Sequence, residues 1–131
     1  MYIKKIVAEN SANQSTVFLS FLDIQPRKNE TAIITGGARG IGLEVVRKLL
    51  ENEMHVIIGC RNKTAGEKAI ASLRAEGVTS GTHDVIELDV ASLNSVKQFA
   101  ETVKQKYKEL HLLINNGLYN TLNVGLCCCI K

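Results

Sequence analysis

Short apolar runs alternate with longer stretches of helical periodicity through the middle of the chain. The runs are mostly aliphatic or β-branched, as is typical of strands buried on both faces, and they occupy residues 31–35, 55–59, 84–88 and 110–114. Apolar residues recur at steps of three and four in the segments between them, which predicts amphipathic helices over residues 41–50, 63–75 and 93–107. This alternation predicts right-handed βαβ units and an α/β fold with a doubly wound parallel sheet, in the strand order 3-2-1-4.

Each predicted helix has one apolar face, which we expect to lie against the sheet. In the first helix this face consists of Ile41, Val45, Val46, Leu49 and Leu50. In the second it consists of Ala65, Ala69, Ile70 and Leu73, and Gly77 follows as a stop signal. In the third it consists of Leu93, Val96, Ala100, Val103 and Tyr107, with Ser92 as the expected N-cap.

A glycine-rich turn follows the first predicted strand and opens the first predicted helix. Its glycines Gly36, Gly40 and Gly42 have the spacing Gly-x3-Gly-x-Gly. We expect Gly36 to permit a tight turn, Gly40 a close approach of phosphate oxygens, and Gly42 close packing of helix on sheet. Strand, turn and helix together direct unpaired N–H groups at one point, which predicts a dinucleotide site; the alternative is a helix N-terminus that binds nothing. The Gly-Lys-Ser/Thr ending of a P-loop is absent, which disfavours a nucleotide hydrolase.

The residues after the second predicted strand bear on the choice between NAD and NADP. A site for NAD usually has a carboxylate there, about twenty residues after the glycines, to bind the ribose 2′-hydroxyl. This chain has Cys60 at that place and Arg61 next to it. A guanidinium pairs well with the 2′-phosphate of NADP, and Arg39 in the glycine turn adds a second cation. We therefore expect NADP, unless both arginines simply face water.

Polar residues also follow the third and fourth predicted strands. Asp89 can accept a hydrogen bond from the adenine amino group while Val90 covers the ring, or Asp89 can cap the following helix. Asn115 and Asn116 end the fourth strand, on the crevice side of the sheet. They can hold a cofactor ribose or tie neighbouring strands together through their amides.

Composition narrows the class of protein further. The chain has 131 residues, of which 45% are hydrophobic and 22% charged, so it is long enough for one domain with a real core. A net charge of +3 and six Phe and Tyr residues without Trp do not suggest a nucleic-acid surface. Three of the four cysteines are adjacent, at 127–129, which suggests neither a disulfide framework nor a metal site. We expect a reducing, cytoplasmic location.

Four segments together resemble the short-chain dehydrogenase/reductase family, and the second is most similar to its retinol-dehydrogenase-like members. They are residues 35–42, 60–62, 88–90 and 113–116, within a resemblance that covers about residues 29–117. The resemblance implies a Rossmann-type fold and an NADP-dependent oxidoreductase of alcohols or ketones. It places Gly36, Arg39, Gly40, Ile41 and Gly42 at the pyrophosphate. It places Arg61 and Asn62 at the 2′-phosphate of the adenosine ribose, Asp89 and Val90 at the adenine, and Asn115 near the second ribose.

Two departures from the family pattern concern catalysis. The family usually has Asn-Asn-Ala-Gly after the fourth strand, whereas this chain has Gly117 directly after the two asparagines. Its chemistry also uses a Tyr-x-x-x-Lys pair with an upstream Ser, and none of the three tyrosines here has a lysine four residues on. We therefore assign no catalytic residue and no metal ligand.

The expected organisation is an irregular leader over residues 1–28, the NADP-binding half-domain over 29–117, and an irregular Cys-rich tail over 118–131. An apolar run at residues 16–22 is shorter than the roughly twenty residues of a membrane span. A membrane-associated full-length relative is the alternative to a cytoplasmic protein. We expect that the chain is the cofactor-binding part of a longer enzyme.

Three functional hypotheses follow. The first is an NADP-dependent oxidoreductase represented by its cofactor-binding part, whose alcohol or carbonyl substrate requires the full-length form. The second is a non-catalytic, NADP-binding or regulatory isoform that pairs with a full-length relative through the open edge of the fourth strand, an edge that also invites self-association. The third is an unstable product without a function of its own.

Overall fold

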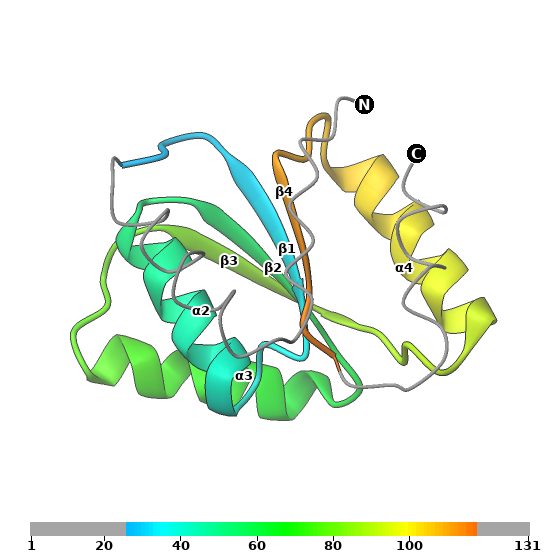
Figure 1. Cartoon of the computed structure of the whole chain (residues 1–131), viewed down its shortest axis with the longest axis horizontal. Coiled ribbons are helices and arrows are strands. Elements are labelled where there is room, and N and C mark those ends of the chain that lie inside the picture. Colours follow the sequence, from blue (N-terminus) through cyan, green and yellow to red (C-terminus); the bar gives the residue numbers. More distant parts are fainter. Residues whose placement is uncertain (1–25, 118–131) are drawn as a thin grey trace, which may run out of the picture.

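Residues 26–117 are described by the computed structural model, and within them four strands alternate with three helices (Figure 1). The strands are β1 (Thr31–Thr35), β2 (His55–Cys60), β3 (Thr82–Glu87) and β4 (Leu112–Asn115). The helices are α2 (Gly40–Glu51), α3 (Lys63–Ala75) and α4 (Leu93–Lys106). Each of these elements was predicted from the hydrophobic pattern, with bounds that differ by no more than two residues.

The strands form one parallel sheet in the order β3-β2-β1-β4, which confirms the predicted order 3-2-1-4 and a Rossmann-type fold. In the register of the sheet, Thr35 at the end of β1 lies beside Gly59 of β2 and Asn115 of β4. Cys60 lies beside Glu87 at the end of β3. The strands therefore end along one line, which we call the carboxyl edge of the sheet.

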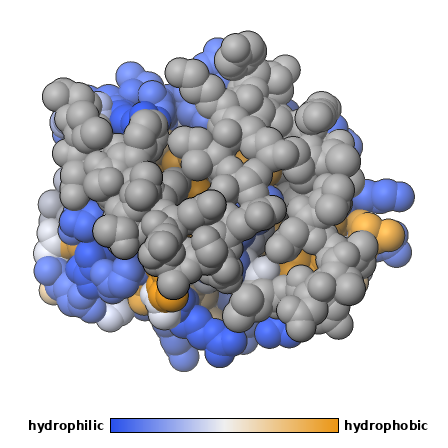
Figure 2. Space-filling view, in the orientation of Figure 1, coloured by the Kyte–Doolittle hydropathy of each residue, from blue (hydrophilic) through white to orange (hydrophobic). Residues whose placement is uncertain are grey.

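Helices cover both faces of the sheet, and β1, β2 and β4 are mainly apolar for that reason, whereas β3 at the sheet edge is more polar. Helices α2 and α3 lie on one face and α4 lies on the other (Figure 1). Alternate residues of β1 serve the two faces: Ile34 packs in the core beneath α2 and α3, while Ile33 packs with Phe99 beneath α4. Each of these side chains is at most 1% exposed, and burying one stabilises the fold by about 1.5–3 kcal/mol. Hydrophilic residues dominate the outer surface of α3, along the lower edge of the view in Figure 2.

The predicted helix faces were wrong at their first turns. Ile41 and Leu93 are 66% and 56% exposed, although both were expected on buried faces. Each lies in the first turn of its helix, at the carboxyl edge, where no described element covers it. Ala65 is exposed as well, because the adjacent Gly66 faces the sheet, where a Cβ would lie 2.6 Å from Val85 Cγ1.

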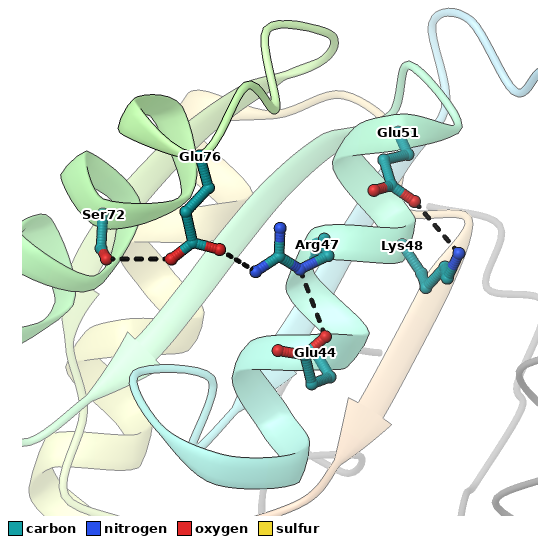
Figure 3. Close-up of polar contacts among 6 residues, drawn as sticks. All are labelled: Glu44, Arg47, Lys48, Glu51, Ser72 and Glu76. Carbon is teal, nitrogen blue, oxygen red and sulfur yellow. Dashed lines mark hydrogen bonds and ion pairs between the residues drawn. The ribbon is translucent and has the colours of Figure 1, made fainter.

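An ionic network joins α2 to α3 on the surface. The Arg47 guanidinium donates hydrogen bonds to Glu44 in its own helix and to Glu76 directly after α3 (Figure 3). The hydroxyl of Ser72 donates to the other carboxylate oxygen of Glu76, at 3.2 Å. Exposed ion pairs contribute little stability one by one, so the main effect of this network is to fix how the two helices lie side by side.

A second polar cluster ties α4 to the sheet at the end opposite the carboxyl edge. Asp84 of β3 accepts a hydrogen bond from the Tyr107 hydroxyl and pairs with Lys106 Nζ at 2.8 Å. His55 Nδ1 lies 2.6 Å from Thr82 Oγ1, while His55 Nε2 lies 3.2 Å from Asp84 Oδ2 without the alignment of a hydrogen bond.

These contacts shift the acidity of each group in the cluster. Burial, together with the hydrogen bond to Asp84, raises the pKa of Tyr107 to about 12. Burial lowers the pKa of His55 despite the nearby carboxylate. Burial acts to raise the pKa of Asp84, but hydrogen bonds from Lys106 and Tyr107 outweigh it and hold that pKa below its usual range. The cluster therefore consists of an ionised carboxylate beside a neutral imidazole at neutral pH.

The predicted tail over residues 118–131 lies outside the described residues, and so does the predicted leader apart from residues 26–28. In that short part, the Arg27 N–H donates to the carbonyl oxygen of Asn52 at 2.7 Å, and Lys28 pairs with Glu53 at 3.0 Å. Within residues 26–117, no helix is both long and apolar enough to span a bilayer.

Candidate functional site

The glycine turn joins β1 to α2 at the carboxyl edge of the sheet. Gly36 and Gly40 have φ angles of +68° and +55°, in the left-handed region that glycine adopts without strain. Arg39 occupies the N-cap position of α2 in an extended conformation, and its side chain makes no capping hydrogen bond. The N–H of Leu43 is the first in the helix to bond a carbonyl four residues back, that of Arg39, at 3.3 Å. The N–H groups of Gly40, Ile41 and Gly42 therefore lack helix partners, and the first turn holds no acidic residue.

The glycines of the turn differ in what surrounds them. A Cβ on Gly42 would overlap the carbonyl oxygen of Gly36 and lie 2.5 Å from Asn116 Nδ2. A Cβ on Gly40 would meet nothing within 4 Å, so the backbone there is open. Gly42 therefore lets α2 approach the strand ends closely, as expected, and Gly37 in the turn is crowded too, since a Cβ there would lie 2.9 Å from Val46 Cγ2. Sequence reasoning missed Gly37, although its place between two expected glycines was a usable signal.

The end of β4 holds the glycine turn in place. The hydroxyl oxygen of Thr35 accepts hydrogen bonds from the N–H groups of Asn116 and Gly117, at 3.1 and 2.9 Å. The side-chain amide of Asn116 donates to the carbonyl oxygen of Gly36 at 3.2 Å. The prediction that these amides tie neighbouring strands is confirmed for Asn116. Thr35 is the residue that sequence reasoning missed here; it is 2% exposed and ends an otherwise apolar strand.

The end of β2 has a buried thiol and an exposed guanidinium. Cys60 is 8% exposed, and its Sγ donates to the carbonyl oxygen of Asn62 at 3.3 Å. Burial raises the pKa of this thiol, so Cys60 is neutral at pH 7. Asn62 is the N-cap of α3, because its Oδ1 accepts the N–H of Ala65 at 3.0 Å. Arg61 is exposed, as is Arg39, and neither makes an ion pair within residues 26–117.

The loop after β3 is closed by its own side chains. Asp89 Oδ1 accepts the N–H of Ala91 at 3.1 Å, which forms an Asx turn. Ser92 caps α4 by accepting the N–H of Ser95 at 3.3 Å, so the predicted cap is confirmed and the alternative that Asp89 caps the helix is wrong. Val90 is partly buried against the core beneath α4.

The sheet register brings these segments to one edge but not into direct contact. Asn115 lies at the end of β4, beside Thr35, and is partly exposed. The structure joins the glycine turn to Asn116 directly, whereas no hydrogen bond or ion pair among the described residues joins Arg61 or Asp89 to that turn. Parallel sheets bind ligands in the crevice outside the carboxyl ends of their strands, where all of these residues lie. No group of three or more His, Cys, Asp and Glu within the described part is arranged to hold a metal ion.

Comparison with known proteins agrees with this geometry. The family model for short chain dehydrogenases matches residues 30–123. Polyprenol dehydrogenase of Danio rerio is 38% identical over 95 residues, which are 72% of this chain and 29% of that protein. Menthone neomenthol reductase from Mentha piperita has a TM-score of 0.64 at 29% identity, covering 72% of this chain and 33% of that one. The NADP complex of RhlG from Pseudomonas aeruginosa has a TM-score of 0.62 at 28% identity, covering 70% and 36%.

The chain belongs to the short-chain dehydrogenase/reductase family of oxidoreductases, whose cofactors are nicotinamide dinucleotides. It spans about a third or less of the length of these relatives. The part that it shares with them contains β1 to β4, and therefore the glycine turn and the crevice beside it.

Proposed function

We propose that this chain is the cofactor-binding part of an NADP-dependent, retinol-dehydrogenase-like oxidoreductase of alcohols or ketones. The observation that carries the proposal is the open glycine turn at the N-terminus of α2. The first turn of α2 has three N–H groups without helix partners and no acidic residue, and Arg39 before it is exposed. These features suit a pyrophosphate. Gly36, Arg39, Gly40, Ile41 and Gly42 would hold it.

The preference for NADP rests on charge at the end of β2. The 2′-phosphate that distinguishes NADP from NAD needs cations and must not meet a carboxylate. Cys60 supplies a neutral thiol where NAD-specific sites have an acid, and Arg61 is exposed beside it. The first turn of α3 also lacks acidic residues, so Arg61 and the cap region at Asn62 suit a phosphate. The RhlG structure, a relative by fold, is itself a complex with NADP.

The adenine and the second ribose would lie along the same edge. Asp89 Oδ2 has no hydrogen-bond partner among the described residues, and it would accept the adenine amino group, with Val90 beside the ring. Asn115, partly exposed at the end of β4, would lie near the second ribose.

The bound dinucleotide would supply a hydride, and this chain would bind and orient it. The polyprenol dehydrogenase and menthone reductase relatives favour an alcohol or carbonyl substrate in a full-length form. None of the three tyrosines has a lysine four residues on, so we assign no proton transfer to this chain. Its cytoplasmic location, with a membrane-associated relative as the alternative, stays a prediction from cysteine usage.

A second candidate function is a non-catalytic, NADP-binding regulatory isoform that self-associates. Among the described strands, β4 pairs with β1 alone, and its other side offers unpaired backbone groups along an apolar strand. Such an edge can pair with a second copy of itself. Sedimentation velocity distinguishes the two: a monomer at micromolar concentration contradicts self-association. The third hypothesis, an unstable product, predicts aggregation and no cofactor binding.

Isothermal titration calorimetry with NADPH and NADH tests the proposed cofactor. We expect NADPH to bind more tightly, and Arg61→Ala to remove most of that difference. Hydrogen bonds between charged groups are worth about 1.5–3 kcal/mol, which corresponds to a loss of roughly ten- to a hundredfold in NADPH affinity. Lys108→Ala is the matched control, because Lys108 is an exposed cation between α4 and β4, at the opposite edge of the sheet. Equal or tighter binding of NADH would refute the assignment of NADP.

A further inference from the structure

We propose that Ser95 is a positioning residue that sets the direction of the Asp89 carboxylate for adenine recognition. The inference rests on the proposed function, because it assigns to Ser95 a role in the specificity of the same site. Ser95 would act through Asp89, because its Oγ accepts the N–H of that residue.

Ser95 joins the loop after β3 to the first turn of α4 through two hydrogen bonds. Its Oγ accepts the N–H of Asp89 at 2.9 Å, and its own N–H donates to the capping hydroxyl of Ser92 at 3.3 Å. In an ordinary capping box, the third helical residue bonds back to the N-cap residue itself. Here it reaches three residues further back, to Asp89, and so binds the whole loop to the helix.

The remaining contacts of Asp89 leave one oxygen available in a fixed direction. Its carbonyl oxygen accepts the N–H of Ser92 at 3.1 Å, and its Oδ1 accepts the N–H of Ala91 at 3.1 Å. The preceding residue, Leu88, is 2% exposed and donates its N–H to the carbonyl oxygen of Cys60 at 2.9 Å. The peptide that ends at the Leu88 N–H is thus held by β2, and the next peptide, between Leu88 and Asp89, is held by Ser95. Of these contacts, only the one from Ser95 comes from a side chain outside the loop.

Removing the Ser95 hydroxyl would leave the Asp89 N–H without an acceptor in a partly buried position, while the Ser92 cap stays intact. An unpaired N–H turns toward water, and the peptide plane turns with it. The Asp89 carboxylate would lose its fixed direction, whereas the glycine turn, whose described hydrogen bonds do not include Ser95, would keep its geometry. Adenine recognition should therefore weaken more than phosphate binding.

The test compares NADPH with its reduced hypoxanthine analogue, in which a carbonyl oxygen replaces the adenine amino group. An acceptor at Asp89 favours the amino group and repels the carbonyl, so we expect wild type to prefer NADPH by roughly tenfold or more. In Ser95→Ala, as in Asp89→Ala, this preference should fall close to one. Ser95→Thr keeps a hydroxyl and should retain the preference. Asn94→Ala, at the exposed neighbouring position of α4, should leave it unchanged.

The outcomes separate this inference from the proposed function. If Asp89→Ala loses the preference while Ser95→Ala keeps it, Ser95 does not position the carboxylate, although the cofactor site stands. If wild type binds neither nucleotide, the proposed function itself fails, and this inference fails with it. Should Ser95→Ala not fold, amide hydrogen exchange of the wild type decides the matter. A protected Asp89 N–H supports the inference, and free exchange at that amide overturns it.

Discussion

Substitution of Gly40 by alanine should separate the stability of the glycine turn from its ability to bind phosphate. Gly40 has a φ of +55°, and a Cβ there would meet nothing within 4 Å. The new methyl group would therefore clash with no part of the described chain. It would occupy the open space where phosphate oxygens are expected to approach the backbone.

Gly77 offers a matched control, because it also has a positive φ but lies outside the glycine turn. It has a φ of +97° after the end of α3, and a Cβ there would also meet nothing within 4 Å. An L-residue in the left-handed region costs about 1–2 kcal/mol, so both alanine variants should lose about that much free energy of unfolding. Only Gly40→Ala should lose phosphate contacts. Losing one charge-assisted hydrogen bond, at about 1.5–3 kcal/mol, would weaken NADPH binding by roughly ten- to a hundredfold.

Urea denaturation measures the first effect and calorimetric titration with NADPH measures the second. We expect the two variants to have similar unfolding midpoints but different dissociation constants, with Gly77→Ala binding like wild type. If Gly40→Ala also binds NADPH like wild type, the pyrophosphate does not lie against this turn, and the reasoning from open backbone is refuted.

Three further predictions concern the stability of the fold. Gly42→Ala should destabilise the chain by about 1–3 kcal/mol in urea denaturation, because a Cβ would overlap the Gly36 carbonyl; a stability equal to wild type would contradict that packing. Tyr107→Phe removes the hydroxyl that donates to Asp84 and should cost about 1 kcal/mol by the same assay, so an unchanged midpoint would show that this hydrogen bond adds nothing. The pKa of His55 is lower in the folded chain, so the unfolded chain binds more protons, and the free energy of unfolding should fall as pH drops below the unfolded value of 6.5. His55→Gln should weaken this dependence of the free energy of unfolding on pH. An unchanged dependence would show that other titrating groups cause it.

The hydrophobic pattern predicted the elements and their order well, because this fold makes the pattern unusually clear. Both faces of the sheet are covered, so strands such as β1, with Ile33 and Ile34, appear in the sequence as continuous apolar runs. The errors fall at the first turns of helices. Periodicity extends an apolar face to Ile41 and Leu93, but these residues lie at the carboxyl edge of the sheet, where the described chain offers them nothing to pack on.

The candidate site was predictable in its location more than in its contacts. Glycine spacing identified the turn. The hydrogen bonds of Thr35 and Asn116 that hold it, however, join residues about eighty positions apart, and no local sequence pattern predicts such contacts. The N–H of Asp89 likewise donates to a hydroxyl six residues further along, in the next helix. The lack of a carboxylate at the end of β2 and the presence of a cation could be predicted from Cys60 and Arg61. That burial raises the pKa of the thiol and keeps it neutral required the structure.

The most direct test of the central claim is a two-dimensional amide NMR titration of the whole chain with NADP⁺. If the glycine turn binds the pyrophosphate, the amide signals of Gly40, Ile41 and Gly42 should shift most. The amide signals of Arg61 and Asp89 should shift as well, and the amide signal of Gly77 should not shift. Saturating NADP⁺ that leaves the three turn amides unmoved would contradict the assignment of this turn as the cofactor site.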